Sequence, residues 1–81
     1  METRVAMIAI IVENPDSVEA VNALLHEYSS GIIGRMGIPY REKGVNIISI
    51  AIDAPQDEIN TLAGKIGRLD GVTAKTVYSA V

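Results

Sequence analysis

Two short segments of this chain are apolar at nearly every position, and they limit strongly how it can fold. They are Val5–Val12 and Val45–Ile52. Both are rich in β-branched residues and bounded by turn-forming residues, which predicts strands. Because a strand alternates its side chains between the two faces of a sheet, a continuous apolar run indicates that both faces are covered. The remaining sequence suffices for about two helices, which cover only one face of a small sheet.

Length and composition exclude several classes of protein. The chain has 81 residues, which predicts a single domain that spans residues 1–81. The absence of cysteine excludes disulfides, zinc–thiolate sites and iron–sulfur ligation. Ten acidic residues outnumber seven basic ones, which argues against direct binding of nucleic acid. The apolar runs are shorter than the ~20 residues that span a bilayer, and no secretory signal pattern precedes the first strand. We therefore expect a cytoplasmic protein without a cofactor.

Periodicity and turn residues divide the chain into six predicted elements. Strands are expected at Arg4–Val12, Ile32–Ile38, Val45–Asp53 and Val72–Tyr78, and helices at Pro15–Tyr28 and from Pro55 to about Leu69. Glycines and a closing proline mark the second strand as an edge strand. The order βαββαβ predicts an α+β, ferredoxin-like sandwich. Its four-stranded antiparallel sheet has the order 4-1-3-2, with both helices on one face. Right-handed crossovers are expected to place the first and third strands at the centre, side by side and parallel.

The uncovered face of this sheet predicts association with further copies of the chain. Leaving several hundred Å² of apolar surface in water is unusual for a monomer. We expect a homo-oligomer, either a dimer or a dimer of dimers. The sequence does not tell which set of alternating side chains faces the helices, so candidates from both sets remain. The interface candidates are Ala6, Ile8, Ile10, Ile48 and Ile50 from one set, and Met7 and Ile47 from the other.

Charged residues around the second strand form the strongest candidate for a ligand site. Arg35, Arg41 and Glu42 lie on this strand and the hairpin that follows it. Guanidinium groups bind carboxylate or phosphate through paired hydrogen bonds, although charges on an edge strand more commonly prevent aggregation. His26, the one histidine, is a fourth candidate, although a solvated or interface position is the more usual role. No metal site or catalytic nucleophile–base pair is predicted.

Several spaced residues carry a resemblance to a known family. The pattern is Val21-Asn22-x-Leu24-Leu25-His26-x-Tyr28-Ser29, Arg35-x-Gly37-x-Pro39-x-Arg41-Glu42, Leu62-x-Gly64-Lys65-Ile66-Gly67 and Gly71-Val72-x-x-Lys75-Thr76. It resembles the family of iron-only hydrogenase system regulators. This resemblance implies a stand-alone ACT-like domain, similar to the C-terminal effector domain of the nickel-responsive repressor. The repressor's nickel site does not carry over, because this chain has one histidine and no cysteine.

Two functional interpretations follow. The resemblance implies a regulatory module that senses a small-molecule effector or a protein partner and does not contact nucleic acid directly. The alternative is a small oligomeric enzyme of ferredoxin-like fold, in which His26 or Tyr40 acts as the acid–base. The absence of paired catalytic groups favours the regulatory module.

Overall fold

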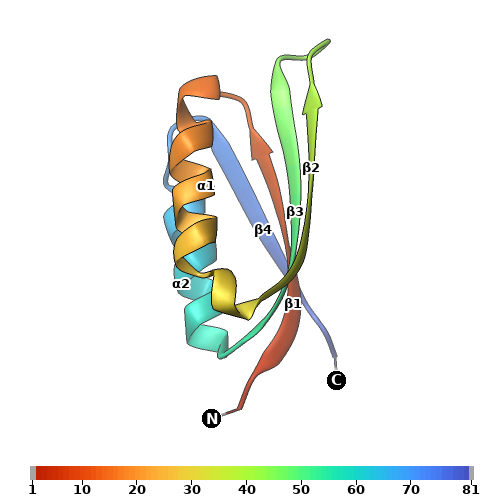
Figure 1. Cartoon of the computed structure of the whole chain (residues 1–81), viewed down its shortest axis with the longest axis vertical. Coiled ribbons are helices and arrows are strands. Elements are labelled where there is room, and N and C mark those ends of the chain that lie inside the picture. Colours follow the sequence, from red (N-terminus) through yellow and green to blue (C-terminus); the bar gives the residue numbers. More distant parts are fainter. Residues whose placement is uncertain (1, 81) are drawn as a thin grey trace.

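A computed structural model describes residues 2–80, and its elements alternate as the periodicity predicts (Figure 1). In chain order they are β1 (Arg4–Val12), a 3₁₀ turn (Pro15–Ser17), α1 (Val18–Glu27), a second 3₁₀ turn (Ser29–Gly31), β2 (Ile32–Tyr40), β3 (Val45–Ala54), α2 (Gln56–Gly67) and β4 (Val72–Tyr78). Both helices pack on one side of the sheet and leave the other side open. The α+β, ferredoxin-like architecture is therefore confirmed.

The sheet has the order β2-β3-β1-β4, which confirms the predicted neighbours. All three pairings are antiparallel, including the central pair of β1 and β3. The expectation that these two central strands run parallel is wrong. The crossover through α1 returns the chain parallel to β1, but the β2–β3 hairpin then reverses it. The strand inserted beside β1 must therefore run in the opposite direction.

The core lies between the sheet and the two helices. Residues at alternate positions of β1 are buried, beginning with Ala6 and ending with Val12. Their partners on the neighbouring strand β3 include Ile48, Ile50 and Ile52, which are also buried. The helices contribute apolar side chains at helical spacing to the same cluster, namely Val21, Leu25, Ile59, Leu62 and Ile66.

Local chemistry explains the element boundaries. Asn14 caps the first turn by accepting a hydrogen bond from the backbone N–H of Asp16 at 3.0 Å, and Pro15 occupies that turn. The first turn is 3₁₀, so the α-helix begins three residues later than predicted. β2 continues through Pro39 to Tyr40, beyond the predicted end at Ile38. A proline fits there because β2 is an edge strand with only one hydrogen-bonded neighbour.

A polar cluster fastens the β1–α1 turn to the α2–β4 turn. The Asn14 amide donates to Asp70 Oδ2 at 2.6 Å, and the Ser17 hydroxyl donates to the Asp70 carbonyl at 2.6 Å. The backbone N–H of Glu13 donates to the Gly71 carbonyl at 2.7 Å. These bonds fix the position of Pro15, which lines a surface hollow.

Candidate functional site

The first hollow lies between α1 and β2 and is built around Arg35. The register pairs Arg35 with Ile50, which is fully buried, so Arg35 projects toward the helix layer. Its Nη2 donates a hydrogen bond to Asn22 Oδ1 of α1 at 2.9 Å. The hollow has a volume of about 220 Å³ and is lined by Val18, Asn22, Arg35, Gly37, Ile38, Pro39, Asn46 and Ile48. The bond to Asn22 holds a guanidinium group at the wall of a small, largely apolar recess.

A second hollow adjoins the first at the hairpin end of the sheet. Its volume is about 290 Å³, and it is lined by Pro15, Pro39, Tyr40, Arg41, Gly44, Val45 and Asn46. The two hollows share Pro39 and Asn46. The Tyr40 hydroxyl donates to Glu42 Oε2 at 3.2 Å, but Glu42 lines neither hollow. The structure thus brings Arg35 and Arg41 to neighbouring recesses and leaves Glu42 outside them.

The two guanidinium groups beside the recesses offer positive charge and hydrogen-bond donors to a small anion. Neither Arg35 nor Arg41 forms an ion pair with a carboxylate of residues 2–80. Guanidinium groups retain their charge at any physiological pH and present several donors in a plane. A carboxylate or phosphate could therefore accept hydrogen bonds from either group, and the prolines would supply apolar contact.

His26 is not part of either hollow. It lies exposed in the last turn of α1, which ends beside the start of β2 (Figure 1). Tyr40 lies at the other end of β2, and a nine-residue strand rises about 26 Å between its ends. The two residues proposed as alternative acid–base groups are therefore far from each other. Within residues 2–80 the His26 side chain forms no hydrogen bond or ion pair, and the Tyr40 hydroxyl donates one hydrogen bond, to Glu42.

Sequence reasoning missed the residues that shape these recesses. Asn22, Asn46 and Pro15 come from three different elements, and only the tertiary fold brings them together. One signal was available. Asn22 follows the core residue Val21 and is exposed on α1, at a position where a helix surface could meet the edge strand.

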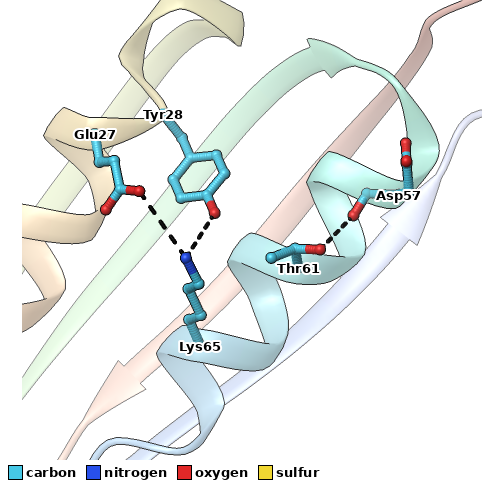
Figure 2. Close-up of polar contacts among 5 residues, drawn as sticks. All are labelled: Glu27, Tyr28, Asp57, Thr61 and Lys65. Carbon is cyan, nitrogen blue, oxygen red and sulfur yellow. Dashed lines mark hydrogen bonds and ion pairs between the residues drawn. The ribbon is translucent and has the colours of Figure 1, made fainter.

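A separate polar cluster links the two helices (Figure 2). Lys65 Nζ donates to the Tyr28 hydroxyl at 3.0 Å and lies 3.9 Å from Glu27 Oε2. The hydrogen bond to Tyr28, the charge interaction with Tyr28 and the nearby Glu27 carboxylate together raise the pKa of Lys65. On the same helix, the Thr61 hydroxyl donates to the Asp57 carbonyl at 2.7 Å. This cluster ties α1 to α2 and is exposed rather than recessed.

The second candidate surface is the open face of the sheet. Met7 and Val77 are 52% and 68% exposed there, whereas Ile8 is fully buried on the opposite face. The structure thereby resolves which set of side chains meets the helices. Five interface candidates, Ala6, Ile8, Ile10, Ile48 and Ile50, lie in the core and cannot meet a partner, because each is at most 5% exposed. Met7 and Ile47 lie on the open face.

Other features of the described chain carry less chemistry. A wide hollow of about 550 Å³ at the start of α2 is lined by Glu2, Pro55, Gln56, Asp57 and Asn60, and presents carboxylate and amide groups beside a proline. Within residues 2–80, histidine and carboxylate side chains form no group of three that could hold a metal ion. Neither described helix has the length and apolar character that crossing a membrane requires.

Comparisons with known proteins agree with the fold. Residues 4–76 match the model of the TM1266-like family, described as "Iron-only hydrogenase system regulator, putative". The solved structure of the uncharacterized protein TM1266 from Thermotoga maritima is similar, with 37% sequence identity and a TM-score of 0.91. The match covers 95% of this chain and 98% of that one. A search of curated proteins gave no match. The chain belongs to the TM1266-like family of iron-only hydrogenase system regulators.

Proposed function

We propose that this chain is a stand-alone ACT-like regulatory module of the iron-only hydrogenase system, which acts by binding rather than by catalysis. The family description supports a regulatory role. The βαββαβ fold, with both helices on one face of the sheet, supports the likeness to ACT domains. We expect the module to act in the cytoplasm and to bind a small-molecule effector or a protein partner without contacting nucleic acid directly.

The proposed effector is a small molecule that carries a carboxylate or phosphate group. The observation that carries this proposal is the Arg35–Asn22 hydrogen bond of 2.9 Å at the wall of one hollow, next to the hollow of Arg41. An anionic group in either recess would draw on the guanidinium group beside it, and charge-assisted hydrogen bonds of this kind are the strong ones. Glu42, which is bonded to Tyr40, would contact a cationic group of an effector that extended over the hairpin.

His26 would have a different role in this scheme. Its position in the last turn of α1 separates it from the hairpin hollow. It would contact an effector only if that molecule extended along α1 from the Arg35 hollow.

A panel of small anions tests the effector site. Thermal unfolding is followed with inorganic phosphate, amino acids, dicarboxylates and nucleoside monophosphates, each over a range of concentrations. We expect at least one probe to raise the unfolding temperature of the wild type, because a ligand that binds only the folded state stabilises it. The double variant Arg35→Ala/Arg41→Ala should lose at least about nine-tenths of that affinity, since each lost charge-assisted bond is worth about 1.5–3 kcal/mol.

The control is Arg68→Ala/Lys75→Ala, which removes the same amount of positive charge from other surfaces. It should keep the ligand-induced shift. A shift that survives unchanged in the Arg35→Ala/Arg41→Ala variant, or that falls equally in the control, rejects this site.

A further inference from the structure

The open face of the sheet is apolar at its centre and charged only toward its margin. Its large exposed side chains come from all four strands, namely Val5, Met7, Ile11, Met36, Ile38, Tyr40, Ile47 and Val77. Lys75 lies on the edge strand β4, and Asp53 lies near the end of β3. Protein interfaces share this anatomy, in which an apolar centre is surrounded by a polar rim.

The exposed apolar area approaches what a stable dimer needs. Those eight side chains expose between 37% and 68% of their surfaces. Together they amount to roughly 600 Å² of apolar area, at or above the largest patch of a typical monomer. A standard interface buries about 800 Å² on each partner, and the small residues and backbone between these side chains would supply the remainder.

Strand register arranges this face in rows that alternate in size. One row runs across the sheet through Ile38, Ile47 and Ile11; we call it the isoleucine row. The next row runs from Met36 through Ser49 and Ala9 to Lys75 and is small only on the two central strands; we call it the small-residue row. On β1 and β3, a ridge of branched side chains therefore lies directly beside a trough.

A two-fold axis would match these rows to each other. If the axis runs across the strands between the two rows, Ile47 and Ile11 of each copy lie over Ser49 and Ala9 of the other, and Ile38 lies over Met36. The same operation places Tyr40 of one copy over Gly34 of its partner. Tyr40 lies one row beyond the isoleucine row, and Gly34 lies one row beyond the small-residue row on the opposite side of the axis. Space is open above Gly34, where an added Cβ would meet no atom within 4 Å. Interdigitation of this kind is how stacked sheets pack at about 10 Å.

We propose that the open face pairs with a second copy of this chain about that two-fold axis, with Ile47 opposite Ser49 and Ile11 opposite Ala9. A two-fold interface must be self-complementary, because the same patch serves both subunits. The adjacent ridge and trough meet this requirement. A dimer formed in this way would bury the part of the open face nearest the β2–β3 hairpin, including Ile38, Tyr40 and Ile47, and would leave the Arg35 hollow on the helix side accessible.

Complementary substitutions test the pairing. Ile47→Ser creates a gap in both contacts of the dimer, and Ser49→Ile places isoleucine against isoleucine. Each variant alone should raise the dimer dissociation constant at least about tenfold, since both cavities and overpacking are destabilising. An equal mixture of the two should restore dimerisation, because each contact in the mixed dimer again joins an isoleucine to a serine. The Ile47→Ser/Ser49→Ile double variant should dimerise by itself for the same reason.

Sedimentation equilibrium measures these constants, and circular dichroism checks that each variant is folded. We expect a wild-type dimer at micromolar concentration and recovery to within about threefold of wild type in the mixture. Any of three results overturns the proposal: a monomeric wild type, single variants that dimerise normally, or a mixture no tighter than the weaker variant alone. Gly34→Leu provides a second measurement if a variant unfolds. The monomer has room for the side chain, but the partner's Tyr40 would meet it, so normal dimerisation of Gly34→Leu also overturns the proposed register.

Discussion

Gly71→Ala should destabilise the protein far more than Gly44→Ala, although both glycines have the same backbone conformation. Their φ angles are +68° and +66°, in the left-handed region that costs a residue with a side chain about 1 kcal/mol. Their surroundings differ. A Cβ at Gly71 would lie 2.7 Å from Asn14 Cβ and 2.9 Å from the Asn14 backbone nitrogen, whereas a Cβ at Gly44 meets nothing within 4 Å.

The clash at Gly71 cannot be relieved by turning a flexible side chain. Asn14 is held by its bond to Asp70 and by the cap that it forms with Asp16. The neighbouring Glu13 is bonded to the Gly71 carbonyl itself. Overpacking at a fixed site costs about 1–3 kcal/mol. Added to the cost of the left-handed backbone conformation, this lowers the free energy of unfolding of Gly71→Ala by about 2–4 kcal/mol in total. For a chain of this size, about 1 kcal/mol corresponds to an unfolding-temperature shift of roughly 4–8 °C.

Urea unfolding measures both variants against the wild type. Protein concentration is kept equal throughout, because self-association would make the apparent stability depend on it. We expect the free energy of unfolding to fall by about 1 kcal/mol in Gly44→Ala, and by about 1–3 kcal/mol more than that in Gly71→Ala. Equal losses would refute the reasoning that close approach to Asn14, and not backbone conformation alone, requires glycine at position 71.

Two further predictions concern the core and the helix pair. Ile8→Ala should lower the free energy of unfolding by about 2–5 kcal/mol because the side chain is fully buried, whereas Val77→Ala on the open face should lower it by under about 1 kcal/mol. Similar losses for the two variants in urea unfolding would contradict the assignment of the two faces. The pKa of Lys65 is raised above its ordinary value of 10.5 by Tyr28 and Glu27, so its stabilising effect is present below that pH and is lost as pH rises through the folded-state pKa. Unfolding temperatures above pH 10.5 should therefore fall more steeply in the wild type than in Lys65→Met, and parallel profiles would contradict this.

Local patterns in the sequence predicted most of the fold. β1 and β4 begin and end at the predicted residues because their apolar runs are bounded by strong turn signals, Glu13–Ser17 before α1 and Asp70–Gly71 before β4. The parallel direction predicted for β1 and β3 is wrong, because the β2–β3 hairpin reverses the chain after the crossover through α1. The predicted end of β2 at Ile38 is two residues too early, because an edge strand tolerates a proline within it.

The sites were harder to predict than the fold. Periodicity showed that both sets of side chains in β1 are apolar, but it could not tell that Ile8 faces the helices and Met7 faces away. That choice depends on how the strand packs against α1 and α2, which is a tertiary property. Arg35 and Arg41 were named from their chemistry, yet the recesses beside them need Asn22 of α1 and Pro15 of the first turn. Contacts between residues so distant in the chain leave no local pattern.

Methyl NMR with a soluble paramagnetic probe tests most directly whether a second copy of the chain covers the open face of the sheet. Met36 carries a reporter methyl group on that face, is 58% exposed in the single chain and would lie under the partner's Ile38 in the proposed dimer. At high protein concentration we expect its methyl signal to be shielded from the probe, and on dilution below the dimer dissociation constant we expect strong paramagnetic relaxation. Equally strong relaxation of the Met36 methyl group at every concentration would show that this face stays in water and would contradict the proposed dimer.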